Sequence, residues 1–260
     1  MKRRKFSIFT EGQSIELDTY TRDAGKELLF FLHGLGCSKD SFHHVWNRPD
    51  FDRFSILAPD LVGFGDSTKP ESFSYTMEAQ ARVCAEILAE FSDKNLHIIA
   101  HSMGGAVALL LPDQVLSCAK SFVNVEGNLI DADCGILSRK IISVSPAIFK
   151  SYLFPELCEE FGHLREKYAA MHSTSADVLY RSAESLIAWS DSNMLLTVFL
   201  ALPCRKAYFY GDENAAHPTI ASIGDVPKVK IKRSGHFSMN DNPEDFYDEL
   251  YTFLTASAMT

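Results

Sequence analysis

Four short apolar runs, each ending at glycine, proline or polar turn residues, constrain the fold of this 260-residue chain more than any other feature. They are residues 28–32, 55–58, 96–100 and 121–125. Runs of four or five apolar residues bounded by turns are typical of strands that are buried on both faces. Such strands occur almost only in parallel sheets covered by helices, so the runs predict an α/β fold.

Helical periodicity separates these runs, as a parallel sheet requires. The apolar residues Met77, Ala81, Cys84 and Leu88 share one helical face, and Thr76 precedes them as an N-cap. A second helix is expected over residues 106–110, between the third and fourth runs. Strand–helix–strand order implies right-handed crossovers, and ligands of such sheets collect beyond the carboxyl ends of the strands.

The second half of the chain contains a long helical segment. No strand pattern is visible over residues 129–193, where two helical stripes are expected at 157–171 and 179–186. Strands return at 207–210 and 229–231, and a final helix begins after Asn242 and Pro243, a cap and a first-turn residue. We therefore predict a core of residues 1–128 and 194–260 with a helical insertion at 129–193.

Composition narrows the class of function. Lys and Arg total 25 and Asp and Glu total 34, a net charge of −9, which disfavours proteins that bind nucleic acid or anionic membranes. No apolar stretch reaches the roughly 18–20 residues of a membrane span, and none follows the basic run 2–5 as a signal peptide would require. We expect a cytoplasmic protein. The six cysteines are scattered without metal-ligand spacing, so we expect neither a metal nor another cofactor.

The sequence Ala100-His101-Ser102-Met103-Gly104 lies between the third run and the following helix. A serine at a sharp strand-to-helix turn exposes its hydroxyl, and small neighbours let strand and helix pack closely. The segment resembles the nucleophile elbow Gly-x-Ser-x-Gly of the α/β-hydrolase superfamily, with Ala100 replacing the first glycine. The resemblance covers nearly the whole chain. It implies a mostly parallel twisted sheet with helices on both faces, and a cap formed by 129–193.

The resemblance also assigns an oxyanion hole and a general base. His33-Gly34 follows the first run, where the family carries a His-Gly pair. The implied oxyanion donors are the backbone N–H groups of Leu35 and Met103, whereas His33 is expected to be a structural hydrogen-bonding residue. His236 lies in the loop before the last helix, which is the family position of the catalytic histidine, and imidazole titrates in the range needed to deprotonate a serine.

The acid of the implied triad has two candidate positions. The usual family position, three residues beyond Gly211, is occupied here by Asn214, which carries no charge. Asp212 is close by but out of register. Some members carry the acid after the strand that follows the nucleophile helix, where this chain has Glu126. An unpaired carboxylate at the end of a buried strand is costly, so a partner is expected. We predict Glu126, with Asp212 as the alternative.

These residues predict a serine hydrolase that cleaves carboxylic esters with small to medium acyl or alcohol groups through an acyl-enzyme on Ser102. Its partner is then a small-molecule ester; the sequence does not define an oligomeric state. A C–C bond hydrolase, a thioesterase or a non-catalytic binding protein of the same fold are the alternatives. Possible pocket-lining residues from the insertion are Phe149, Tyr152, Phe154, Tyr168, Met171 and Trp189, and possible carboxylate-binding residues are Arg139, Arg165 and Arg181.

Overall fold

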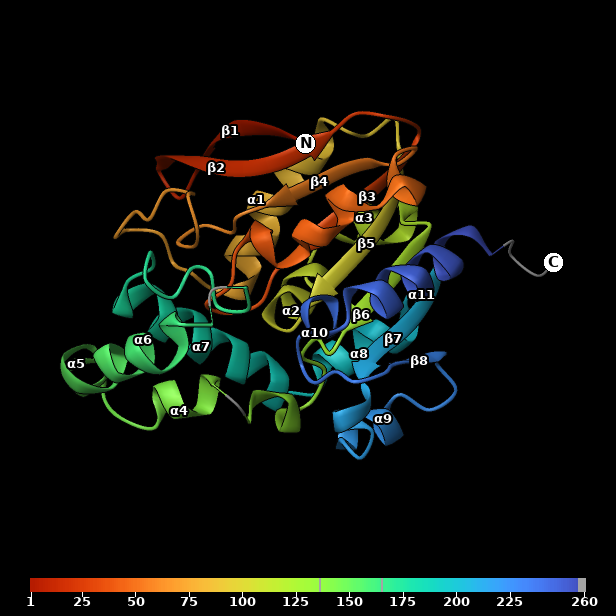
Figure 1. The fold of residues 1–260 in the computed structure, drawn as a ribbon. Coiled ribbons are helices and arrows are strands. Elements are labelled where there is room, and N and C mark those ends of the chain that lie inside the picture. The colour runs from red at the N-terminus through yellow and green to blue at the C-terminus, as the bar shows by residue number, and fades with distance from the viewer. Residues whose placement is uncertain (136, 165, 257–260) are drawn as a thin grey trace.

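An eight-stranded sheet forms the centre of the computed structural model, which describes residues 1–135, 137–164 and 166–256 (Figure 1). Its spatial order is β1-β2-β4-β3-β5-β6-β7-β8. The strands are β1 (Lys2–Thr10), β2 (Gln13–Arg22), β3 (Glu27–Leu32), β4 (Ser55–Pro59), β5 (Asn95–His101), β6 (Ser121–Val125), β7 (Arg205–Gly211) and β8 (Lys228–Ile231). Strands β3 to β8 pair in parallel, and β2 pairs antiparallel with β1 and β4.

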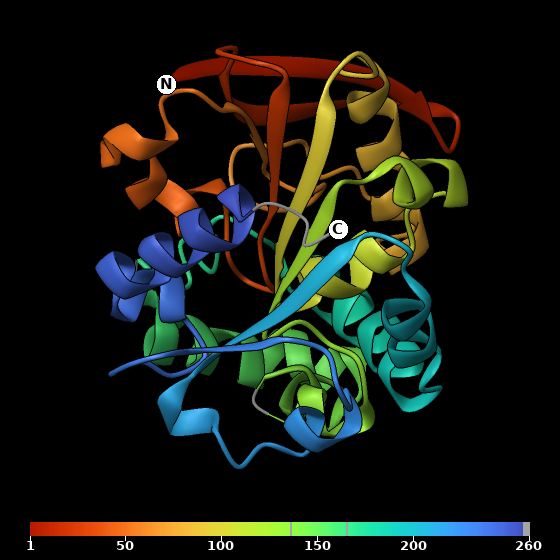
Figure 2. The same ribbon diagram turned by 90° about the vertical axis from the view of Figure 1, so that its right-hand side faces the viewer.

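Helices cover both faces of this sheet (Figure 2). One face carries α1 (Met77–Ala89), α2 (Met103–Leu109) and α8 (Met194–Ala201), and the other carries the 3₁₀ helix η1 (Lys39–Asn47) and α11 (Pro243–Thr255). The shorter helices are α3 (Asp113–Cys118), α9 (Pro218–Ser222) and α10 (Ser238–Asp241). Every residue of β4 and β6 is buried, as strands between two helical layers must be. The predicted fold class is confirmed.

The local signals used to place helix starts also agree with the structure. The Thr76 side chain accepts a hydrogen bond from the backbone N–H of Ala79 at 3.2 Å, which caps α1. Asn242 caps α11 in the same way through the N–H of Asp245 at 3.3 Å, and Pro243 opens the helix. Each cap satisfies a backbone donor that the first turn of a helix leaves without a partner.

The antiparallel hairpin β1–β2 was not predicted. Its strands are joined by Glu11 and Gly12, whose φ angles are +49° and +75°. Two consecutive positive φ angles are typical of the two-residue turns that match the twist of a hairpin. Phe6, Ile15 and Leu17 point inward and are buried. The hairpin extends the sheet past β4, away from the parallel strands that carry the site.

The predicted insertion folds into helices beyond the carboxyl ends of the parallel strands (Figure 1). They are α4 (Ser138–Ile142), α5 (Pro146–Ile148), the π-helical segment η4 (Phe149–Leu153), α6 (Phe154–Gly162) and α7 (Ala176–Asp191). Helix α7 packs against α1 and α2 of the core. The prediction of one helical stripe over 157–171 was wrong, because α6 ends at Gly162. The His172 ring packs so closely against Gly162 that a Cβ at this position would overlap it.

Candidate active site

Ser102 occupies a strained turn between β5 and α2. Its φ of +52° lies in the left-handed region that favours glycine, a conformation that costs roughly 1–3 kcal/mol and persists only where the surroundings enforce it. The Ser102 N–H donates to the carbonyl of Val125 at 3.2 Å, and its carbonyl accepts from the N–H of Asn128 at 3.3 Å. A Cβ at Gly104 would lie 2.5 Å from the carbonyl oxygen of Leu32. Only glycine therefore allows α2 to start this close to β3.

The structure brings His236 and Glu126 together across 110 residues of sequence. His236 Nδ1 lies 3.0 Å from Glu126 Oε2. Glu126 Oε1 accepts from the N–H of Gly211 at 2.8 Å, and Asn214 Nδ2 donates to Oε2 at 2.8 Å and to Oε1 at 3.1 Å. Burial raises the pKa of Glu126, but these hydrogen bonds outweigh it, so the pKa lies below its usual value and the group is ionised at neutral pH. An ionised Glu126 fixes the tautomer with hydrogen on Nδ1, which leaves His236 Nε2 as an acceptor.

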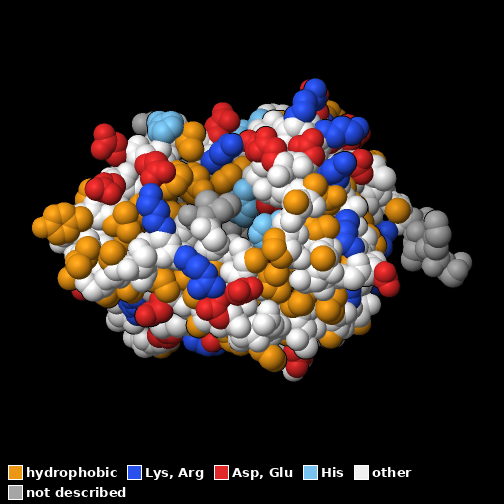
Figure 3. Space-filling view, turned by 90° about the horizontal axis from the view of Figure 1, so that it is seen from below, with side chains coloured by type: hydrophobic (Ala, Val, Ile, Leu, Met, Phe, Trp, Pro, Cys, Tyr) orange, Lys and Arg blue, Asp and Glu red, His pale blue; other side chains and the backbone are white. Residues whose placement is uncertain are grey.

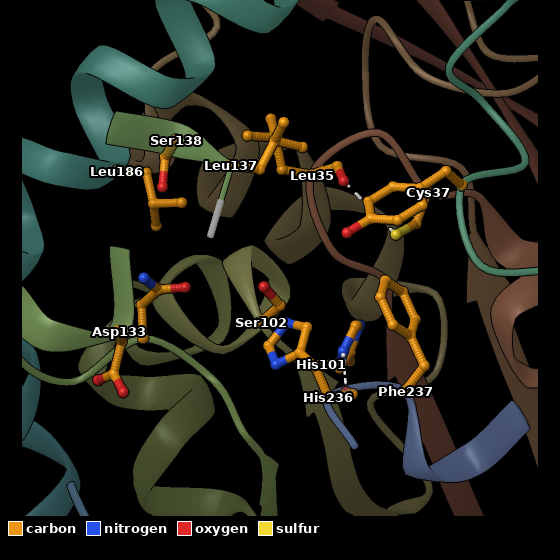
Figure 4. A pocket seen from close by; sticks show the side chains of 12 residues that line it. Leu35, Cys37, His101, Ser102, Asp133, Leu137, Ser138, Leu186, His236 and Phe237 are labelled. Carbon is orange, nitrogen blue, oxygen red and sulfur yellow. Dashed lines mark hydrogen bonds between the residues drawn. The ribbon is translucent and has the colours of Figure 1, made fainter. Parts of the chain in front are cut away.

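Ser102 and His236 border the same cavity, and Figure 4 shows both side chains among those that line it. Among the residues that the structure describes, none accepts a hydrogen bond from the Ser102 hydroxyl, and none joins it to the His236 ring. Hydrogen bonds of this kind are often long without substrate and tighten when it binds.

Asp212, the alternative acid, does not contact His236. Its Oδ1 accepts the N–H of Ser234 at 3.1 Å. Backbone hydrogen bonds from Arg233 and Ser234 lower the pKa of Asp212. The role of Asn214 was missed. Its position was visible in the sequence, because it stands where the family usually carries the acid, but its contact with Glu126 depends on the pairing of β6 with β7.

The two backbone N–H groups predicted as oxyanion donors belong to Leu35, which lines the cavity, and to Met103, which follows Ser102 at the start of α2. Neither Leu35 N nor Met103 N has an acceptor within residues 1–135, 137–164 and 166–256. His33 fastens the loop after β3 to the segment after β4: its Nδ1 donates to the carbonyl of Gly34 at 2.8 Å, and its Nε2 accepts the N–H of Leu61 at 3.0 Å. These contacts agree with the structural role expected for His33.

His101 supports the loop that carries His236. Its Nε2 donates to the His236 carbonyl at 2.9 Å, and the two ring centroids are 4.8 Å apart. Burial first, and the neighbouring His236 second, hold the pKa of His101 well below its usual value. His101 is therefore neutral near pH 7, and its donor to the carbonyl is kept over the whole neutral range.

The cavity beside Ser102 is small and partly open to solvent. Figure 3 shows a hollow on this face with histidine side chains beside it. Of the aromatic and methionine side chains predicted to line it, Tyr168 does so, and the prediction for the other five was wrong. Phe149 is buried, Met171 is buried with its methyl group against Gly36, and Tyr152 is 70% exposed. The insertion contributes instead Asp133, Leu137, Ser138 and Leu186.

One acidic cluster has the spacing of a metal site. Asp18, Asp60 and Asp66 lie within ligand distance of one another. Lys39 Nζ sits among them, at 3.1, 2.6 and 3.1 Å from the three carboxylates. Burial lowers the pKa of Lys39, but the carboxylates, Asp60 above all, outweigh this effect and raise it. The ammonium group thus fills the position that a cation would take.

Comparison with known proteins identifies the family. The sequence pattern of the alpha/beta hydrolase fold matches residues 27–243, and the chain belongs to this family. Lipase 1 of Psychrobacter immobilis is 39% identical over 87 residues, which are 33% of this chain and 26% of the lipase. The chain thus matches about a quarter of that relative's length.

Solved structures share the fold along nearly the whole chain. A thermophilic esterase from Thermogutta terrifontis superposes with a TM-score of 0.76 at 18% identity, covering 98% of both chains. A carboxylesterase structure from Nitrososphaera gargenis gives 0.77 at 16% identity, covering 95% of this chain and 97% of the other. Among the described residues, no helix is both long and apolar enough to cross a membrane.

Proposed function

We propose that this protein is a serine hydrolase that cleaves carboxylic esters with small to medium acyl or alcohol groups. The observation that carries the proposal is the arrangement around His236. A buried carboxylate holds Nδ1, and the remaining nitrogen belongs to a ring that borders the same cavity as the Ser102 hydroxyl. The esterase and lipase similarities support the same reaction class.

In the proposed mechanism, His236 Nε2 accepts the Ser102 proton while Oγ forms a bond to the ester carbonyl carbon. The oxyanion is stabilised by the N–H groups of Leu35 and Met103, each contributing about 3–4 kcal/mol by analogy with similar donors. His236 then returns the proton to the alcohol oxygen as the C–O bond breaks, leaving an acyl group on Ser102. Water, deprotonated by His236, attacks the acyl-enzyme and releases the acid. Glu126 orients the ring and stabilises its charged form.

The arginines predicted to bind a substrate carboxylate bear on the choice between an ester and an acidic substrate. Arg139 pairs with Asp191 at the surface, and Arg181 donates to the Glu71 carbonyl. Neither of these two arginines lines the Ser102 cavity. Arg165 lies outside the residues that the structure describes. A C–C bond hydrolase acting on an acidic substrate therefore has less support than an esterase, and a thioesterase would use the same groups.

Labelling and turnover test the proposal together. A fluorophosphonate probe is expected to modify the folded wild-type protein at Ser102, as shown by peptide mass spectrometry, and p-nitrophenyl acetate and butanoate are expected to be hydrolysed with burst kinetics. S102A is the matched control and should show neither property. A folded wild-type protein that takes up no label and cleaves no ester would instead support a non-catalytic binding protein.

A further inference from the structure

The cavity extends to two sides of Ser102, and the sides differ in chemistry (Figure 4). On the first, Leu35, Cys37 and Phe237 surround an apolar space, closed by Tyr168, whose ring lies 5.0 Å from that of Phe237. The second, here called the Asn128 side, contains the polar residues Asn128, Asp133 and Ser138 beside Leu186. A substrate that fills both sides therefore meets different environments with its two halves.

Asn128 is held next to the nucleophile and is almost completely buried. Its N–H donates to the carbonyl of Ser102 at 3.3 Å, and the residue is 2% exposed. A buried amide oxygen without a donor costs about 1–3 kcal/mol, so its partner matters. The orientation of the side chain decides which group faces the cavity.

The contacts of Ser190 fix that orientation. The Ser190 hydroxyl donates its hydrogen to the Leu186 carbonyl at 2.9 Å, so its oxygen can only accept from Asn128. Asn128 Nδ2 is the donor, at 3.4 Å, and also lies 3.3 Å from Cys134 Sγ. With Nδ2 directed at α7, Oδ1 is the atom left to face the cavity, and no described residue donates to it.

The other polar groups on this side are already engaged. Asp133 accepts the N–H groups of Leu129 and Ile130 at 2.7 and 2.9 Å with one oxygen, and the Thr219 hydroxyl at 2.6 Å with the other. The Ser138 hydroxyl donates to the carbonyl of Cys134 at 3.3 Å. The Ser138 oxygen keeps lone pairs that can accept, so this side offers a ligand two acceptors, and Asn128 Oδ1 is the one that belongs to the residue bonded to the Ser102 backbone.

From this arrangement, and resting on the proposed function, we infer that Asn128 is a specificity-determining residue. It selects esters that carry a hydrogen-bond donor, a hydroxyl or an amide N–H, on the half that fills the Asn128 side. The donor satisfies Oδ1, whereas an apolar group of the same shape displaces water from Oδ1 and leaves it unpaired. The opposite half of the substrate is apolar.

Two pairs of esters that differ only by hydroxyl against methyl test the inference. In the first, p-nitrophenyl 3-hydroxybutanoate is compared with the 3-methylbutanoate. In the second, 2-hydroxypropyl butanoate is compared with 2-methylpropyl butanoate, followed by acid release. The wild type is expected to prefer the hydroxyl member of at least one pair. In Asn128→Leu the ratio of kcat/KM values should fall about tenfold, the upper range for one neutral hydrogen bond. Both members are measured on one protein sample, so the ratio is independent of the folded fraction.

A further variant separates Asn128 from its neighbour Ser138. Ser138→Ala removes the other acceptor on this side and should leave the ratio unchanged. Equal kcat/KM values within both pairs for the wild type, or a ratio lost in Ser138→Ala but kept in Asn128→Leu, would overturn the inference while leaving the esterase proposal intact. If neither member of any pair is cleaved and Ser102 takes no fluorophosphonate, the proposed function fails and the inference with it.

Discussion

Replacing Glu126 by glutamine is expected to abolish most activity while leaving the shape of the site unchanged. Both carboxylate oxygens face donors only: Oε2 meets His236 Nδ1 at 3.0 Å and Asn214 Nδ2 at 2.8 Å, and Oε1 meets Gly211 N at 2.8 Å. Whichever position the new amide nitrogen takes, it confronts a donor. Facing His236, it favours the tautomer with hydrogen on Nε2, which cannot accept the Ser102 proton.

The size of the effect follows from this tautomer change. An acid-to-amide replacement in a triad with intact geometry lowers kcat by roughly 10⁴-fold, and we expect a loss of about 10³- to 10⁴-fold here. The mispaired buried amide should also reduce the free energy of unfolding by about 1–3 kcal/mol. Steady-state hydrolysis of p-nitrophenyl butanoate gives kcat, and urea denaturation gives the free energy.

Asp212→Asn is the matched control, because it makes the same chemical change on a carboxylate that bonds the backbone of Ser234 and does not reach His236. Its kcat should stay within about threefold of the wild type. The reasoning is refuted if Glu126→Gln retains more than a tenth of wild-type kcat, or if Asp212→Asn loses as much.

Further perturbations probe the turn, the pair and the supporting ring. The thermal unfolding midpoint of Ser102→Gly should be higher than that of Ser102→Ala, because glycine adopts a positive φ without strain. An equal or lower midpoint for Ser102→Gly would show that the turn is not strained. Asn214→Asp places a second carboxylate within hydrogen-bond distance of Glu126, so one of them should protonate; the thermal midpoint should fall at pH 7 and recover toward pH 5, and a pH-independent midpoint would speak against it. His101→Phe removes the donor to the His236 carbonyl and should lower kcat about tenfold with unchanged KM and pH profile.

The lowered pKa of Glu126 also makes the free energy of unfolding depend on pH in the acid range. The pKa of Glu126 is lower in the folded protein than in the unfolded chain, so its contribution is complete above the unfolded value, near 4.3, and is lost as the pH falls through the lower folded value. The unfolding free energy of the wild type should therefore decline more steeply below about pH 4.5 than that of Glu126→Gln. Parallel declines in urea titrations from pH 6 to pH 3 would contradict this assignment of the shift.

The sequence could predict those features that local patterns encode. Short stretches of neighbouring residues predict the six parallel strands, the cap at Thr76 and the start of the last helix at Pro243. The structure contains all of these features. The Glu11-Gly12 turn of the hairpin was equally local, but the short alternation around it was overlooked.

Contacts between distant segments were beyond the same reasoning. Asn214 reaches Glu126 because β6 and β7 pair with Val125 opposite Phe209, a register that no local pattern encodes. The prediction of which residues line the cavity was wrong for a related reason. Periodicity shows which residues share a helix face, but packing of α7 on α1 and α2 decides which face looks toward Ser102, so Leu186 lines the cavity and Trp189 does not.

The hydrogen bonds from Ser102 N to Val125 O and from Asn128 N to Ser102 O fasten the serine turn to the end of β6, one residue from Glu126. Ser102, Glu126 and Asn128 are thus held together at the end of β6, whereas His236 lies on a separate loop before α10. Displacement of the His236 ring from Ser102 and Glu126 should therefore come chiefly from movement of that loop. Directed evolution of a faster variant would accordingly do best by rigidifying the segment before α10 and leaving the end of β6 untouched.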